Sequence, residues 1–342
     1  MSLTCLRSNA LLRGRAWFSV ALKISIIGAG GIGSYYARLV ELLEGVELAY
    51  VCDVDEAKAR AVAGEVGCRY TTRLEEAVEG CDAVLIATPP FARLDAVKTA
   101  VEAGRPVFCE KPLARSLGEA REIERLARGR VPFMVGFTLR WWPVYERLKE
   151  LLERGELGEP AMLWLTDMTY WSDTLRRAPW RRRGELSTGI FEQLVHELDI
   201  ARYLLGEVEE VYAHGARRVL EEVDYEDCVA VTFKFRSGAV GCVAGSVASR
   251  LWHRRGLLVC SRAAAYFDTG EQSLRIASAE GERSEKLGWR GDPYLMELKE
   301  FVRWVEEGVE ARATLEDGVK AQELVEAAIK SLREGRPVKL PL

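Results

Sequence analysis

The sequence contains very little asparagine, no zinc-binding motif and no stretch typical of a membrane-spanning helix. Asn9 is the only asparagine in 342 residues, whereas Glu, Arg and Val are plentiful, a composition that hints at a thermophilic source. No apolar stretch is long enough to span a bilayer, so no membrane partner is expected. The eight cysteines contain no C-x-x-C pair. They predict no metal site and fit a reducing cytoplasm.

A large net charge of either sign is also absent. The net charge of −4 gives no electrostatic reason to expect nucleic acid as a partner. Hydrophobic residues make up 48% of the chain, which is enough apolar material for packed cores. At ~150 residues per domain, the length predicts about two domains. Residues 1–21 form an extension without acidic residues, for which a transit peptide, an upstream start codon and an expression artefact remain open.

From Leu22 onward, short apolar runs alternate with helix-length segments. Strand-like runs separated by helices predict a parallel sheet covered on both faces, so residues 22–140 are expected to form a Rossmann domain of the α/β class. After Trp142, several strand candidates follow one another without helices between them. Residues 141–342 are therefore expected to form an α+β domain with an open, largely antiparallel sheet. The C-terminal segment of this domain can pack back on the first.

The segment IIGAGGIG contains the spacing G-x-G-x-x-G between a predicted strand and a predicted helix. Gly28 would make the tight turn, Gly30 would let a pyrophosphate approach the backbone, and Gly33 would let the helix pack close to the strand. Asp53 ends the next strand, where a carboxylate accepts hydrogen bonds from both ribose hydroxyls of NAD and repels the extra phosphate of NADP. A glycine-rich turn with Asp53 as a helix cap is the alternative.

The segment FCEKPL at 108–113 places a lysine at the carboxyl end of a strand-like run. Ligands of open α/β sheets bind at that edge. Pro112 disfavours helical backbone at Lys111, so the lysine is held extended over the predicted crevice. Because partial burial lowers the pKa of lysine readily, Lys111 is a candidate to donate to a substrate oxygen or to help deprotonate a hydroxyl. A solvated surface lysine is an equally good interpretation of this residue alone.

A predicted helix over about 190–205 carries one histidine between acidic residues. Glu192, His196, Asp199 and Tyr203 recur at intervals of four, three and four, so they lie on one stripe beside the apolar face of the helix. Carboxylates on both sides are expected to hold His196 in one tautomer and to raise its basicity, which suits a general base. A surface charge pattern around a structural histidine is the alternative.

Together these motifs resemble the Gfo/Idh/MocA oxidoreductase family, which includes glucose–fructose oxidoreductase and inositol dehydrogenase. The resemblance spans nearly everything after residue 22 and is carried by the glycine run at 28–33, Asp53, ATPP at 87–90, EKP at 110–112, VGF at 135–137 and His196 with Asp199. It implies NAD as cofactor, with NADP less expected, and a homodimer or homotetramer formed through the second-domain sheet. It adds to the cofactor site Gly31, Ile32, Thr88, Pro89 and Glu110.

The same resemblance implies roles for the candidate catalytic residues. Lys111 contacts the substrate hydroxyl and the nicotinamide side of the cofactor, and its bond to Pro112 is often cis in relatives. His196 acts as acid/base, Glu192 stands where an assisting aspartate is frequent, and Asp199 helps to orient the catalytic groups. Two departures from the family are Arg93 in place of a common histidine and a glycine run reduced to 187–189.

The expected function is reversible hydride transfer between NAD and a secondary alcohol of a sugar, polyol or related cyclic alcohol. Two alternatives stay open: a redox-neutral NAD-dependent glycosidase of the same fold, and a non-catalytic NAD-binding regulator. As substrate contacts the sequence offers the rings of Trp141 and Trp180, which can stack on a sugar, and Arg181, which can bind a carboxylate or phosphate. Core packing of the rings and a solvated basic loop are the competing interpretations.

Overall fold

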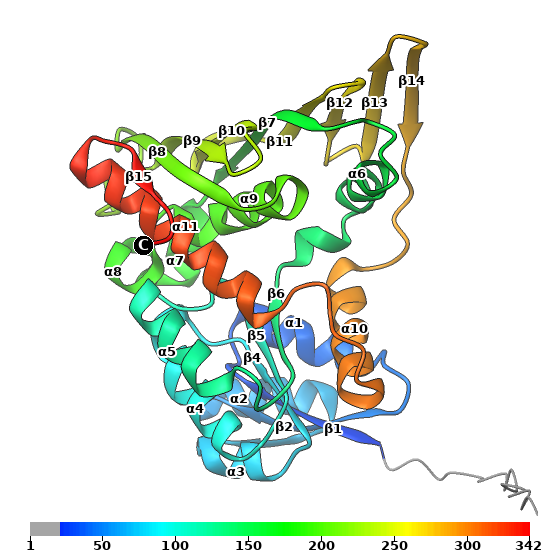
Figure 1. Ribbon diagram of the computed structural model, residues 1–342. Coiled ribbons are helices and arrows are strands. Elements are labelled where there is room, and N and C mark those ends of the chain that lie inside the picture. Colours follow the sequence, from blue (N-terminus) through cyan, green and yellow to red (C-terminus); the bar gives the residue numbers. More distant parts are fainter. Residues whose placement is uncertain (1–20) are drawn as a thin grey trace, which may run out of the picture.

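The computed structural model describes residues 21–342, which form two sheets, one above the other in Figure 1. The predicted extension 1–21 lies outside the described residues, apart from its last residue. No helix within residues 21–342 combines the length and the apolar character needed to cross a membrane. The seven cysteines in this part of the chain are all free thiols.

The first sheet has six parallel strands in the order β3–β2–β1–β4–β5–β6. Its strands are β1 (Leu22–Ile27), β2 (Val46–Cys52), β3 (Arg69–Thr71), β4 (Ala83–Ile86), β5 (Val107–Glu110) and β6 (Phe133–Gly136). Its helices are α1 (Gly31–Val40), α2 (Glu56–Val66), α3 (Leu74–Glu79), α4 (Arg93–Glu102) and α5 (Leu117–Ala127), with a short 3-10 turn, η1 (Pro90–Ala92).

All residues of β4, β5 and β6 are buried, because helices cover both faces of this sheet. This explains why the sequence shows unbroken apolar runs there instead of alternation. Parallel strands joined by helical crossovers end at one common edge, and that edge receives the loops after β1, β4 and β5. The predicted Rossmann sheet is confirmed.

The second sheet has nine strands in the order β14–β13–β12–β11–β7–β10–β9–β8–β15. All neighbours in it are antiparallel except β7 and β10, which run parallel, so the expectation of a largely antiparallel sheet is confirmed. The strands are β7 (Pro160–Tyr170), β8 (Val208–Ala216), β9 (Cys228–Phe235), β10 (Val240–Ser246), β11 (Ala248–Cys260), β12 (Ala263–Asp268), β13 (Ser273–Ser278), β14 (Gly281–Lys286) and β15 (Val338–Lys339).

Helices lie between the two sheets and leave the outer face of the second sheet open (Figure 1). Strand β9 alternates between buried and exposed residues, as expected for a sheet covered on one face only. The helices of this part are α6 (Pro143–Glu153), α7 (Ser172–Arg177), α8 (Gly184–Ser187) and α9 (Phe191–Leu205), with 3-10 turns η2 (Thr138–Trp141) and η3 (Pro179–Arg182).

The last two helices, α10 (Pro293–Glu307) and α11 (Leu315–Glu334), return to the first sheet. Asp292 caps α10 ahead of a proline at its first position, and Thr314 opens α11 with a capping box, so both helix starts are encoded locally. Helix α10 packs on α1 through edge-to-face contacts of Tyr294 with Tyr35 and Tyr36. Helix α11 contacts α5, α9 and β8. The C-terminal segment therefore joins the two sheets.

Candidate active site

The loop after β1 requires glycine at two of its positions. Gly28 has φ +104°, and a Cβ there would lie 2.9 Å from the backbone at Ala87 and Thr88. A Cβ on Gly33 would lie 1.8 Å from the carbonyl oxygen of Gly28, so any larger residue would push α1 away from β1. These are the turn and the close helix–strand approach that the motif predicts.

The start of α1 has the features of a phosphate cradle. Gly30 and Gly31 have open space where a Cβ would be, and the cap position forms no side-chain hydrogen bond. No acidic residue occupies the first turn of α1, so its backbone N–H groups and its positive dipole end are available to an anion. Ile32 is partly buried and packs on the core. The loop residues therefore fit the pyrophosphate of a dinucleotide.

Asp53 lies against this loop at the end of β2. Its Oδ2 accepts a hydrogen bond from the N–H of Ala29 at 2.7 Å, and its Oδ1 accepts one from the N–H of Asp55 at 2.9 Å. Each carboxylate oxygen has a second acceptor site, so both remain able to bind ribose hydroxyls. The cap of α2 is Asp55, which accepts from the N–H groups of Ala57 and Lys58, so the alternative of Asp53 as the helix cap is wrong.

Arg93 connects the loops that follow β4 and β5. Its Nε donates to the carbonyl of Thr88 at 3.0 Å, and its Nη2 donates to the carbonyl of Lys111 at 3.1 Å. The side chain is buried, and its Nη1 and the Thr88 hydroxyl have no partner within residues 21–342. The sequence showed Arg93 only as a departure from the family. The structure shows that it braces the Thr88–Pro89 segment against the lysine.

Lys111 is held at three points. Its N–H donates to Oε2 of Glu110 at 3.0 Å, its carbonyl accepts from Arg93, and its Nζ donates to the carbonyl of Glu192 at 2.9 Å. The side chain is only 14% exposed, which contradicts the solvated surface lysine. The Lys111–Pro112 peptide is cis, as the family resemblance implies. The carboxyl of Glu110 is buried and also accepts a hydrogen bond from the hydroxyl of Tyr36 on α1.

Glu192 is the anion shared by two cations. Its Oε1 lies 3.4 Å from Nζ of Lys111, and Arg181 donates to both of its carboxylate oxygens at 2.8 and 3.1 Å. Burial favours the neutral acid, but the charges of Lys111 and Arg181 outweigh burial and lower the pKa of Glu192 to about 2. Arg181 is thus engaged by Glu192, so the idea that it waits for a substrate carboxylate or phosphate is not supported.

His196 lies one helical turn after Glu192 on α9. Burial lowers its pKa well below the usual 6.5, and the positive charges of Lys111 and Arg254 lower it further. Its Nδ1 has no partner in the described part of the chain, and its ring stands edge-on to Phe137. The expected rise in basicity is therefore wrong, because the two flanking carboxylates bond to arginines and to Lys111 instead. A neutral imidazole can still accept a proton.

Asp199 anchors α9 and does not contact His196. Arg140 donates to its two oxygens at 2.8 and 2.5 Å, and the same guanidinium lies 3.1 Å from Asp317 of α11. Arg140 and Asp199 are both almost fully buried. The predicted orienting role is thus indirect: this ion pair fixes the helix that carries the histidine.

The two candidate tryptophans have different positions. Trp180 is partly exposed on η3, its ring stands edge-on to that of Phe91 at 6.0 Å, and the guanidinium of Arg181 lies 4.3 Å from its ring centre. It therefore connects η3 to η1, which follows β4 of the first sheet. Trp141 is fully buried, and its indole N–H donates to Glu300 at 3.1 Å. It cannot stack on a substrate, and core packing is the correct interpretation of this residue.

A second buried cluster beside His196 was not predicted. Arg254 of β11 lies 2.7 Å from Asp167 of β7 and 3.0 Å from Glu197 of α9, and Gln193 donates to Asp167 at 2.8 Å. Oδ1 of Asp167 has no partner within residues 21–342. The alternation of side chains along β7 could have revealed it. Asp167 lies two and four residues after the buried Leu165 and Leu163, so its carboxylate faces the same, inner side of the strand.

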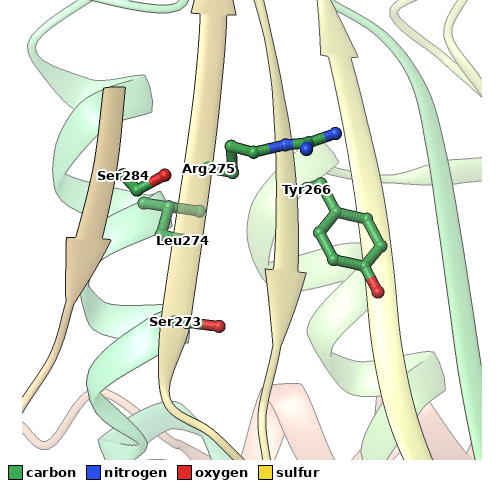
Figure 2. Close-up of a pocket in the computed structure, with 5 residues that line it drawn as sticks. All are labelled: Tyr266, Ser273, Leu274, Arg275 and Ser284. Atoms are coloured by element: carbon green, nitrogen blue, oxygen red, sulfur yellow. The ribbon is translucent and has the colours of Figure 1, made fainter. Parts of the chain in front are cut away.

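None of these residues lines the hollow shown in Figure 2, which has a volume of about 290 Å³ on the outer strands β12 to β14. Its lining residues are Tyr266, Ser273, Leu274, Arg275 and Ser284. Within residues 21–342, no group of His, Cys, Asp or Glu side chains is arranged to hold a metal ion. The polar side chains described above instead gather where Lys111 contacts α9, and Arg93 links that point to the Thr88–Pro89 segment.

Comparison with known proteins agrees with this architecture. Residues 22–137 match a family model described as an oxidoreductase family with an NAD-binding Rossmann fold, residues 145–267 match the GFO/IDH/MocA C-terminal domain, and residues 261–340 match the C-terminal alpha/beta domain of the oxidoreductase family. The chain belongs to the GFO/IDH/MocA oxidoreductase family. It is accordingly an NAD-binding oxidoreductase, and the resemblance seen in the sequence is confirmed.

Several members of the GFO/IDH/MocA family align over nearly their full length. A myo-inositol 2-dehydrogenase from Thermotoga maritima is 31% identical, with 93% of this chain and 98% of the relative covered. A scyllo-inositol 2-dehydrogenase (NAD(+)) from Bacillus subtilis is 32% identical, with 93% and 96% covered. An Agrobacterium radiobacter oxidoreductase, solved in complex with NAD+, L-tartaric acid and magnesium, is 25% identical, with TM-score 0.84 and coverage of 93% and 98%.

Proposed function

We propose that this oxidoreductase transfers hydride reversibly between NAD and a secondary alcohol carbon of a cyclic polyol or sugar. The observation that carries the proposal is the contact of Lys111 Nζ with the Glu192 carbonyl, one turn before His196 on α9. This contact supports the proposal because it links the lysine that follows β5 to the helix that carries the imidazole, and ligands of such sheets bind at the carboxyl ends of the strands. The inositol dehydrogenases among its relatives favour a cyclic polyol.

In this proposal the two side chains divide the proton chemistry. Bound NAD supplies the hydride acceptor at its nicotinamide ring. His196, kept neutral by burial, accepts the hydroxyl proton, and the ammonium of Lys111 stabilises the negative charge that develops on the alcohol oxygen. Glu192 and Arg181 keep that ammonium in place, because Glu192 remains ionised between the two cations. Glu192 is therefore a positioning carboxylate and not a second base.

The proposal includes a preference for NAD over NADP. Asp53 is held by two backbone N–H groups beside the glycine loop, where a 2′-phosphate would meet a carboxylate. We also propose that the chain assembles as a homodimer or homotetramer through the open face of the second sheet, and that it works in a reducing cytoplasm. Two observations support these points: no helix within residues 21–342 covers the outer face of the second sheet (Figure 1), and the seven cysteines in that part of the chain are free thiols.

A substrate panel tests the proposed function. Purified protein is mixed with NAD or NADP and with myo-inositol, scyllo-inositol, other polyols, aldoses, uronates or glycosides, and both the nicotinamide absorbance and the released sugar are followed. We expect net NADH formation with a cyclic polyol. Release of a sugar from a glycoside without net NADH would identify the redox-neutral glycosidase. If the protein binds NAD but converts no compound of the panel, glycosides included, it would be identified as a regulator.

A further inference from the structure

A buried tyrosine on the cofactor helix joins two buried carboxyl groups. The hydroxyl of Tyr36 lies 2.9 Å from Oε1 of Glu110 and 2.6 Å from Oε1 of Glu297. The hydroxyl of Thr138 donates to the same Glu297 oxygen at 2.6 Å. These residues come from α1, β5, α10 and η2, so the cluster connects the C-terminal segment to the cofactor loops. The proposed chemistry uses neither Tyr36 nor Glu297.

The number of protons decides the charge state of this cluster. A tyrosine hydroxyl carries one proton and can donate to only one carboxyl at a time. Both Tyr36 contacts have the length of a hydrogen bond, so one of the two carboxyls must itself donate a proton to the tyrosine oxygen. Two ionised carboxylates bridged by a single proton in a dry interior would repel each other at high cost.

The surrounding charges indicate which carboxyl holds the proton. Glu110 faces the cations of Lys111 and Arg93, which favour its ionised form. Glu297 faces the carboxyls of Glu110 and Asp292, both of which raise its pKa, and Tyr294 packs on Tyr36. Its second oxygen has no partner within residues 21–342. Burial raises the pKa of both acids, and the pKa of Glu297 lies well above its usual value.

The other end of the cluster reaches the catalytic lysine. Oε2 of Glu110 accepts the N–H of Lys111 at 3.0 Å, while Arg93 donates to the carbonyl of Lys111 at 3.1 Å. We propose that Glu297, Tyr36 and Glu110 form a proton-sharing hydrogen-bond chain in which neutral Glu297 donates to Tyr36, Tyr36 donates to Glu110, and Glu110 positions Lys111. The positioning role rests on the proposed function, whereas the shared proton does not.

Three single variants test the chain. Tyr36→Phe removes the bridging hydroxyl but keeps the ring and its packing on Phe108. Glu297→Gln replaces a neutral acid by an amide that can still donate to the tyrosine oxygen. Tyr35→Phe is the matched control, because the neighbouring Tyr35 hydroxyl bonds to Asp292 and not to the chain. Turnover of NAD and myo-inositol, NAD affinity and melting temperature from pH 5 to 9 are measured for each variant.

We expect Tyr36→Phe to lower kcat on the order of tenfold to a hundredfold, the loss caused by misplacing a catalytic group, with NAD affinity unchanged. Glu297→Gln and Tyr35→Phe should keep kcat near the unmodified level. Wild-type kcat in Tyr36→Phe would overturn the positioning role. A loss in Glu297→Gln as large as that in Tyr36→Phe would show that Glu297 accepts a bond as an ion, and would overturn the shared proton.

The melting curves test whether Glu297 is protonated, and they need no substrate. An acid whose pKa is raised by folding stabilises the protein below its ordinary pKa, and this contribution is lost as the pH rises toward the folded pKa. We therefore expect the melting temperature of Glu297→Gln to rise relative to the unmodified protein as the pH increases. A parallel course at all pH values would overturn the neutral Glu297. If the unmodified protein converts no compound of the panel, the proposed function fails while this result stands.

Discussion

Replacing Glu192 by Gln removes the one carboxylate within residues 21–342 that bonds to both Lys111 Nζ and Arg181. The side chain of Glu192 is 5% exposed, so its interactions are not weakened by solvent. Its pKa falls from the ordinary 4.5 to about 2, which corresponds to about 3 kcal/mol of stability at neutral pH. Breaking a buried ion pair by removing one partner costs about 3–5 kcal/mol, which agrees with this value.

A melting experiment measures this loss. In a domain of this size, 1 kcal/mol corresponds to about 2–4 °C, so Glu192→Gln should melt roughly 6–12 °C below the unmodified protein at pH 7. Glu56→Gln is the control, because Glu56 forms an exposed ion pair with Arg60 on α2, and such pairs contribute little. It should melt close to the unmodified protein.

The pH dependence gives the sign of the effect. A carboxyl with a lowered folded pKa contributes its full stability above its unfolded pKa of 4.5 and loses it as the pH falls toward 2. The difference between Glu192→Gln and the unmodified protein should therefore be constant from pH 8 to about pH 5 and shrink below that. Equal melting of Glu192→Gln and Glu56→Gln at pH 7, or a difference that grows on acidification, would refute the buried ion pair.

Three other predictions concern turnover. Lys111→Ala should abolish NADH formation and leave NAD affinity nearly unchanged, since the glycine loop is intact; unchanged turnover would remove Lys111 from the mechanism. Asp53→Ala should erode the ratio of kcat/KM for NAD over NADP, and an unaltered ratio would mean that the ribose is recognised elsewhere. Because the pKa of His196 lies well below 6.5, kcat/KM for alcohol oxidation should stay level as the pH falls through 6.5. A decline centred at 6.5 would contradict the buried neutral imidazole.

The fold was predictable because its signals are local. Each apolar run and each helical pattern is contained within one or two elements. The glycine spacing predicts the turn after β1, where Gly28 and Gly33 leave no room for a Cβ. The antiparallel second sheet was visible as strands without helices between them, although its parallel pair, β7 with β10, was not.

The helix stripe placed Glu192, His196 and Asp199 together on α9, but the contacts that it predicted for the two acids are wrong. The sequence paired both acids with the histidine. In the structure Asp199 binds Arg140, which is 59 residues away in the chain, and Glu192 binds Lys111, 81 residues away. Helical periodicity shows which residues share a face, and it contains no information about the arginines that other segments bring to that face.

The sequence alone determined the parallel sheet, the phosphate loop and the position of the lysine at the sheet edge, because these depend on backbone geometry and on residues close together in the chain. Only the tertiary structure decided the charge states, with His196 neutral and Glu192 ionised. It also decided that Tyr36 joins two buried carboxyl groups. The physical reason is that a pKa depends on burial and on charges within a few ångströms, which folding brings together from distant segments.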